Sequence, residues 1–131
     1  MNTHNIYNNL KKVDLNILIA DDNELKLRFN ISKEKTIDEL RKFLTLTAVE
    51  KMAMVPSEEV DFVFHKLLEH PVLRGEVEQI LGGVLRHDPT LSGRKMRTMF
   101  SKTLSCYAPL FGTPPRENFN KAATCSVDVI R

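Results

Sequence analysis

The sequence predicts an all-α protein, a compact bundle of five or six helices. Apolar residues recur at three- and four-residue spacing through most of the chain after residue 35, which is the period of helices that bury one face. Prolines and good N-cap residues separate these stretches, as expected where one helix ends and the next begins. The length of 131 residues and the hydrophobic content of 42% suit a single domain with a real core.

We expect three segments along the chain: an N-terminal helical leader packed on the core (1–35), a helical core domain (36–125) and a tail (126–131). Within the leader, "VDLNILIADDNELKLRFNIS" fits either a strand pair or two short helices. We favour helices because the rest of the chain is helical and because an isolated hairpin is only marginally stable.

The first core helix is predicted to begin at Thr36. Thr36 and Glu39 have the spacing of a capping box, in which each side chain satisfies a free backbone amide of the other residue. This helix should end near Met52. A second helix should then begin at Ser57, a good N-cap residue, because Pro56 disfavours continuation of the first.

The next helical pattern begins near Pro71 and runs through "VLRGEVEQILGGVLRHDP" to Pro89. Two glycines interrupt it at 82–83, and they either kink the helix or let another backbone approach closely. The last predicted helix covers residues 93–111, and Gly112 with the two prolines that follow should end it.

Composition excludes several classes of protein. The longest early apolar run, "ILIA", is far too short for a secretory signal or a membrane span, so we expect no membrane partner. The two cysteines have neither metal-knuckle spacing nor the number for a disulfide framework. We therefore predict a cytoplasmic protein, although export by a non-classical route would leave no signal of this kind.

The net charge of +2 hides an uneven distribution. Residues 57–88 hold seven acidic and three basic residues, whereas residues 89–131 hold seven basic and two acidic ones. Either acidic and basic helices pack together, or the basic residues form a face for a protein partner. Nucleic acid is not expected, because no exposed aromatic residues are interleaved with the basic ones. The predicted partner-binding residues are Arg94, Lys95, Arg97 and Lys102.

The most informative polar residues are two histidines and two aspartates. Asp61 and His65 are four residues apart and so share a helix face, where a carboxylate can fix the tautomer of an imidazole. His87 could join them, with Asp88 or Cys125 completing the ligands of one divalent metal such as zinc. In the structural alternative, Asp61 and His65 form a polar pair that fixes helix packing, and His87 caps a helix end.

Two functions follow from these residues. One is a small non-enzymatic binding or interaction module with a polar Asp/His core. The other is a metal-binding protein or metal-dependent enzyme that uses His65 and His87. We identify no catalytic residue, because no nucleophile has a base at a recognisable spacing. The sequence therefore leaves open whether the protein is an enzyme, and it does not fix the oligomeric state.

Five short blocks, "RKFLTLTA", "VPSEEVDFVFH", "LGGVLRHDP", "TLSCYAPLFGTPPRENF" and "KAATC", follow one another along the chain. In order and spacing they resemble the N-terminal helical domain of the glycine-rich domain-containing protein-like family of bacteria and plants, over about residues 38–125. The resemblance implies a helical fold but no particular activity. It matches family positions at Asp61, His65, His87, Tyr107, Phe111, Gly112 and Cys125.

The chain departs from this family pattern at several positions. Phe64 stands where the family has tryptophan, and Leu67 and Arg86 stand where it has histidine. The glycine- and cysteine-rich tail that often follows the domain is not found in this sequence. If the family's histidines bind a metal together, this chain keeps only His65 and His87 of that set.

Overall fold

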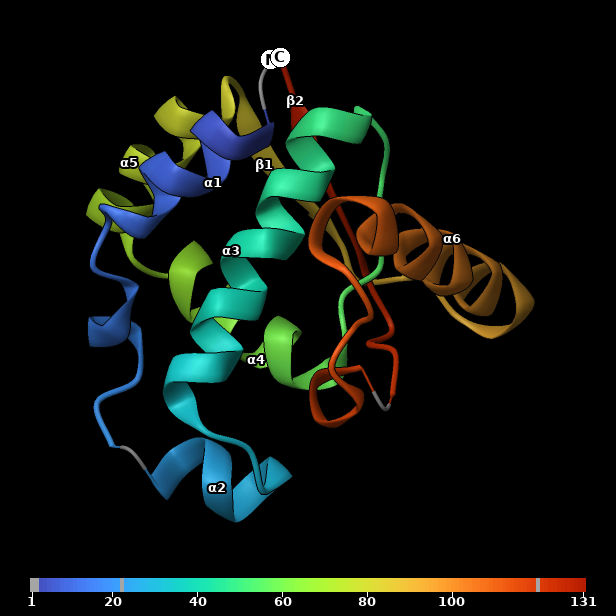
Figure 1. The fold of residues 1–131 in the computed structure, drawn as a ribbon, viewed down its shortest axis with the longest axis horizontal. Helices are drawn as coiled ribbons and strands as arrows, with labels where there is room; N and C mark the ends of the chain where they lie inside the picture. The colour runs from blue at the N-terminus through green and yellow to red at the C-terminus, as the bar shows by residue number, and fades with distance from the viewer. Residues whose placement is uncertain (1–2, 22, 120) are drawn as a thin grey trace.

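The computed structural model describes residues 3–21, 23–119 and 121–131. Within them the chain forms six α-helices, two short 3-10 helices and one antiparallel pair of strands (Figure 1). The predicted mostly helical fold is confirmed, but the two-stranded sheet shows that an all-α bundle was too simple. The elements are α1 (Thr3–Lys11), η1 (Leu15–Leu18), α2 (Asn23–Phe29), α3 (Lys33–Glu50), α4 (Glu58–Leu68), α5 (Pro71–Leu81), β1 (Val84–Asp88), α6 (Gly93–Phe111), η2 (Arg116–Asn118) and β2 (Ser126–Ile130).

The central helix is α3, and α1, α4 and α6 all pack against it (Figure 1). The leader is helical, as predicted, and α1 packs on α3 and α5 through buried Ile6 and Leu10. The largest buried side chains include Phe43 of α3, Phe64 of α4 and Tyr107 of α6. One core therefore joins elements from both ends of the chain.

The predicted start of the first core helix was wrong. The helix α3 begins at Lys33, and the hydroxyl of Ser32 accepts a hydrogen bond from the amide of Lys35. Thr36 lies inside the first turn and donates to the carbonyl of Ser32. Glu39 is buried and accepts a hydrogen bond of 2.7 Å from the hydroxyl of Tyr107. Thr36 also accepts a hydrogen bond of 3.2 Å from the side-chain amide of Asn118, so both residues that resemble a capping box make tertiary contacts instead.

The next two helix starts agree with the sequence. Ser57 caps α4 by accepting a hydrogen bond from the amide of Val60. Pro71 occupies the first turn of α5, where its missing amide hydrogen has no cost. His70 caps this helix, because its Nδ1 accepts from the amide of Leu73.

The prediction that helical structure continues to Pro89 was wrong. The helix α5 ends at Leu81, and Gly82 follows it with a left-handed φ of 80°. A Cβ on Gly83 would lie 2.5 Å from the carbonyl oxygen of Ile130. The glycine pair therefore ends the helix and admits the backbone of β2, which is formed by residues that the sequence suggested were a tail. Strand β1 pairs with β2 from Val84 to Asp88.

The helix α6 projects from the body of the molecule (Figure 1). It packs mainly on α3 rather than on the acidic α4 or α5, so the predicted packing of acidic against basic helices is not what holds it. Only Thr103 and Tyr107 of this helix are buried. No helix in the described part of the chain is both long and apolar enough to cross a membrane.

Candidate metal centre

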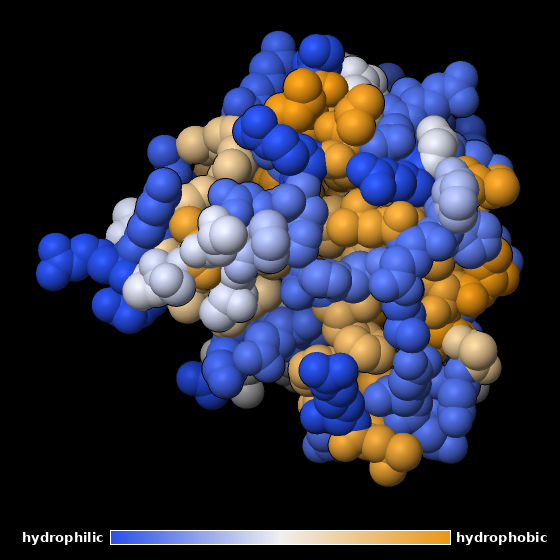
Figure 2. Space-filling model, turned by 180° about the vertical axis from the view of Figure 1, so that it is seen from behind, coloured by the Kyte–Doolittle hydropathy of each residue, from blue (hydrophilic) through white to orange (hydrophobic). Residues whose placement is uncertain are grey.

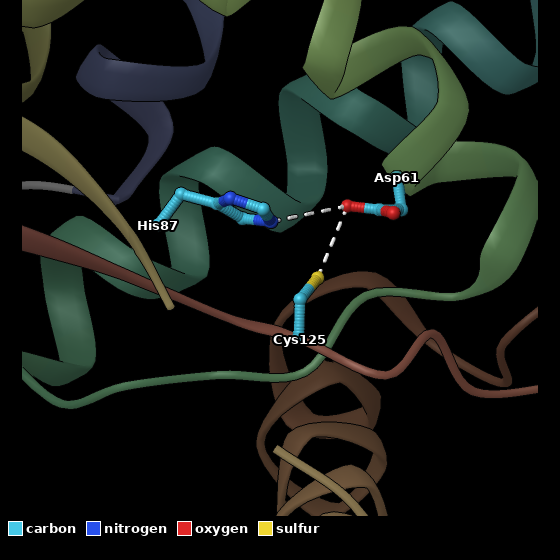
Figure 3. Close-up of side chains that lie close together, drawn as sticks. All are labelled: Asp61, His87 and Cys125. Atoms are coloured by element: carbon cyan, nitrogen blue, oxygen red, sulfur yellow. Dashed lines mark hydrogen bonds and ion pairs between the residues drawn. The ribbon is translucent and has the colours of Figure 1, made fainter. Parts of the chain in front are cut away.

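Three side chains from separate elements converge beside the start of α4 (Figure 3). Asp61 lies in the first turn of α4, His87 on β1, and Cys125 directly before β2. These residues lie far apart in sequence, so the tertiary fold alone brings them together.

The backbone around Ser57 explains how Cys125 reaches α4. The amide of Glu58 donates to the carbonyl of Lys121, and the amide of Ala123 donates to the carbonyl of Pro56, each at 2.9 Å. These bonds hold the segment before β2 along the beginning of α4. Pairing of β1 with β2 then places His87 opposite Val127, two residues beyond Cys125.

Both His87 and Cys125 approach the same carboxylate oxygen, Oδ1 of Asp61. The thiol of Cys125 donates to Asp61 Oδ1 over 3.1 Å, and His87 Nε2 lies 3.9 Å from the same oxygen. The three donor atoms all lie within 4.8 Å of one another. Cys125 is buried, and the His87 and Asp61 side chains are only 15% and 20% exposed. All three side chains are thus largely shielded from solvent.

The imidazole of His87 has an unusual environment. Its Nε2 is buried and has no hydrogen-bond partner in the part of the chain that the structure describes. Buried polar atoms usually have a partner, and each exception calls for an explanation. Burial lowers the pKa of His87, and the neighbouring His65 lowers it further. A neutral imidazole with a free lone pair is the form that ligates a metal.

The thiol of Cys125 is held in its protonated form. Burial raises the pKa of the Cys125 thiol well above its ordinary value, and the hydrogen bond to Asp61 raises it further. A bound metal would replace the shared proton and take the sulfur as a thiolate, as metals do at cysteine ligands. Metal binding at this site should therefore release a proton.

His65 lies beside this cluster rather than inside it. Its Nε2 is 3.2 Å from Asp61 Oδ2, the carboxylate oxygen that does not contact Cys125. Its ring meets that of His87 edge-on, with centroids 4.6 Å apart. The predicted proximity of Asp61 and His65 is present in the structure. The position of His65 suits a residue that orients a ligand from outside the metal's own shell.

The structure does not bring Asp88 into the cluster. Neighbouring residues of a strand face opposite sides, and Asp88 is exposed while His87 faces inward. The Asp88 carboxylate accepts hydrogen bonds from the amide and the hydroxyl of Thr90. The structural alternative for His87 is not seen either, because this residue lies on a strand and its buried Nε2 makes no hydrogen bond to a helix carbonyl among the described residues.

The donor set can be compared with what zinc requires. Zinc binds imidazole nitrogen, carboxylate oxygen and thiolate sulfur at about 2.0–2.3 Å, so neighbouring ligand atoms of a tetrahedral site lie about 3.3–3.8 Å apart. The separations at Asp61 Oδ1, 3.1 Å to Cys125 and 3.9 Å to His87, bracket this range. Small side-chain movements would therefore complete three of four ligand positions.

Two surface hollows flank the cluster. Asp61 and His65 line a groove of about 490 Å³ along the exposed face of α4. His87 lines a second hollow of about 520 Å³, which Asp88 also lines. Asp61 therefore lies at the edge of the groove on α4 and His87 at the edge of the second hollow, whereas Cys125 lines neither.

The sequence left Asp88 and Cys125 as alternatives for completing the set, and the structure brings Cys125, but not Asp88, to Asp61 and His87. A single cysteine far from the other ligands has no spacing signature, so spacing alone could not favour Cys125 over Asp88. The four residues predicted to bind a partner, Arg94, Lys95, Arg97 and Lys102, are all exposed on α6. The projecting end of this helix carries hydrophilic side chains (Figure 2).

Comparison with known proteins adds no further assignment. No protein-family model matches the chain, and neither a curated protein nor a solved structure matches it. The resemblance that the sequence blocks suggest therefore stays a prediction.

Proposed function

We propose that this protein binds one divalent transition metal through Asp61, His87 and Cys125, and that zinc is the ion its donors suit best. The observation that carries the proposal is the buried Nε2 of His87. This atom has no hydrogen-bond partner among the described residues, yet it faces a carboxylate oxygen that also accepts a bond from a buried thiol. A cation at this point would give all three donors a partner.

The fourth coordination position supports a functional rather than a purely structural metal. Three protein ligands plus one open position is the pattern of catalytic zinc sites, whereas structural sites use four protein ligands. Asp61 and His65 both line the groove on α4, which gives solvent a path to the Asp61 carboxylate. His65 holds the second oxygen of Asp61 and leaves Oδ1 available to the metal.

Metal content tests this proposal directly. The protein should be purified without a histidine tag, loaded with zinc, dialysed and measured by elemental analysis. We expect one zinc per chain in the wild type and none in His87→Ala or Cys125→Ser. Cobalt loading should add a thiolate-to-cobalt absorption band that Cys125→Ser abolishes.

Matched variants control for unspecific damage. Asp61→Asn should lose the metal, whereas Asp88→Asn, whose carboxylate lies outside the cluster, should keep it. Cys106→Ser should keep the metal as well, because Cys106 lies on α6. A wild-type protein that stays free of zinc after loading, and whose stability zinc does not change, would contradict the proposal.

A second candidate function is protein binding through α6. The helix has no acidic residue, and its basic residues Arg94, Lys95, Arg97 and Lys102 are all exposed. Such a surface suits an acidic partner. Affinity purification with the wild type and with a variant in which these four charges are reversed tests it. Partners that remain bound to the reversed variant would show that the surface is only solvated.

A further inference from the structure

The helix α6 carries an apolar stripe that lies outside the core. Met96, Phe100 and Leu104 recur at every fourth residue, so they lie on one face of the helix over about 12 Å. All three are only half-buried, and within the described part of the chain none of them belongs to the core cluster. Apolar side chains that are exposed together, rather than singly, indicate an interaction surface.

The stripe lines a hollow, which we call the α6 groove. It measures about 460 Å³, and its other lining residues include Lys121, Ala122 and Thr124 of the segment before β2. A hollow of this size accommodates a few apolar side chains of a partner. A side chain of another protein can enter such a hollow, whereas the flat surface of a lipid bilayer cannot follow it.

Positive charge borders the α6 groove. The helix itself holds no acidic residue. Arg97 lines the groove, and no carboxylate among the described residues lies within ion-pair distance of its guanidinium. Lys121 forms an ion pair of 3.2 Å with Glu58, but both side chains are exposed, so solvent weakens this pair. The groove therefore suits a partner that is apolar at its centre and acidic at its edges.

A second copy of the chain does not have this complementarity. Two α6 helices packed stripe to stripe would bring two identical sets of basic side chains together, and like charges repel across an interface. The acid-rich helices α4 and α5 use their apolar faces in the protein's own core. The charges of the α6 groove thus favour an acidic segment of a different protein.

We propose that the α6 groove binds an acidic amphipathic helix of another protein, whose apolar side chains pack on Met96, Phe100 and Leu104. The inference rests on the second candidate function and specifies its partner and its binding site. A helix fits because its apolar residues, three or four apart, match a stripe of the same spacing. An extended peptide would need a free strand edge for its backbone hydrogen bonds, and a helix offers none.

Selection from a phage-displayed library of random peptides, each about four helical turns long, tests the proposal on the full chain. The enriched peptides should be acidic and should carry apolar residues at helical spacing. The best of them is then synthesised, and its affinity is measured by fluorescence anisotropy. Phe100→Ser should weaken binding by about tenfold or more. Arg97→Gln should weaken it by about threefold, and by less at high salt.

Two matched variants of α2 serve as controls. Leu27→Ser removes an apolar side chain that is 86% exposed, and Lys26→Gln removes an exposed cation; neither residue lines the α6 groove. Both variants should bind the peptide as the wild type does. Circular dichroism verifies that Phe100→Ser keeps its helical content. If that variant does not fold, Met96→Ser must show the loss of binding instead.

Several results would overturn the proposal. They are the absence of enriched peptides, enrichment of peptides that are basic or lack helical spacing, and equal binding by the folded stripe variant. The wild type is also tested for self-association by analytical ultracentrifugation and for binding to phosphatidylserine vesicles. If either occurs and Phe100→Ser abolishes it, the groove serves a second copy or a membrane, and the proposal is wrong.

The same peptide separates this proposal from the second candidate function. Reversal of the four basic charges of α6 should abolish peptide binding. If it does so while Phe100→Ser binds normally, the basic surface alone recruits the acidic partner, and only the groove proposal is wrong. If the charge-reversed protein binds the peptide as the wild type does, the second candidate function is wrong and the groove proposal falls with it.

Discussion

Replacing Gly83 with alanine should destabilise the protein by about 1–3 kcal/mol, the usual range for an added methyl group in a space that is already filled. The new Cβ would lie 2.5 Å from the carbonyl oxygen of Ile130 and 2.8 Å from Cγ1 of Val129. Both distances are far below van der Waals contact, so the end of β2 must move. Part of this movement involves backbone, which cannot rotate away as a side chain can.

Gly75→Ala is the matched control on the same stretch of chain. A Cβ at Gly75 meets nothing within 4 Å, and this residue lies inside α5. Alanine is better than glycine in a helix interior by about 0.5–1 kcal/mol. The two glycine-to-alanine changes should therefore shift stability in opposite directions, by about 1.5–4 kcal/mol relative to each other.

Urea denaturation followed by circular dichroism measures both variants. With a slope of about 2 kcal/mol per molar urea, the midpoint of Gly83→Ala should fall by roughly 0.5–1.5 M. The same variant should bind zinc more weakly, because a displaced β2 disturbs the register that places His87. A Gly83→Ala protein as stable as the wild type would refute the close approach of β2 to the glycine pair.

Three further predictions concern the core and the site. Tyr107→Phe should lower the free energy of unfolding by about 1.5–3 kcal/mol, measured in urea, because it removes a hydrogen bond to the buried carboxyl group of Glu39; no loss would mean that water replaces the hydroxyl. Burial raises the pKa of Glu59, so the native state binds the proton of this carboxyl group more tightly than the unfolded chain does. The free energy of unfolding that this difference contributes should therefore decline as the pH rises above about 4.5. As the pH rises, the urea midpoint should decline less in Glu59→Gln than in the wild type or in Glu58→Gln. If the midpoints of all three proteins decline equally with pH, Glu59 is not the group responsible. Free zinc at a thousandfold excess over its dissociation constant should stabilise the wild type by about 4 kcal/mol, and a chelator should reverse this stabilisation. The variant Cys125→Ser should show neither change. If zinc stabilises this variant as much as the wild type, the thiolate is not a ligand.

Local signals in the sequence were sufficient for most helices. The serine at position 57 and the proline at position 71 each mark a helix start because their effects act within one turn of backbone. The predicted helix over residues 93–111 coincides with α6 for the same reason, since its end depends on the glycine that follows. A helix boundary can be predicted from the sequence when the residues that determine it lie within one turn of it.

The secondary-structure predictions that were wrong concern residues whose structure depends on contacts with distant parts of the chain. Thr36 and Glu39 resemble a capping box, but Asn118 and Tyr107 engage their side chains from the other end of the chain. The residues after Gly83 continue a helical apolar pattern, yet they become a strand because β2 pairs with them. Hydrogen bonds between backbone segments about forty residues apart leave no periodic pattern in the sequence of either segment.

In the candidate site, too, some contacts depend on local sequence and others on distant residues. The sequence by itself determined that Asp61 and His65 lie together, because four residues make about one helical turn. Only the tertiary structure decided that His87 and Cys125 join Asp61 and that Asp88 does not. The physical reason is the alternation of a strand: pairing with β2 turns His87 inward and Asp88 outward, and the approach of β2 to Gly83 fixes that register.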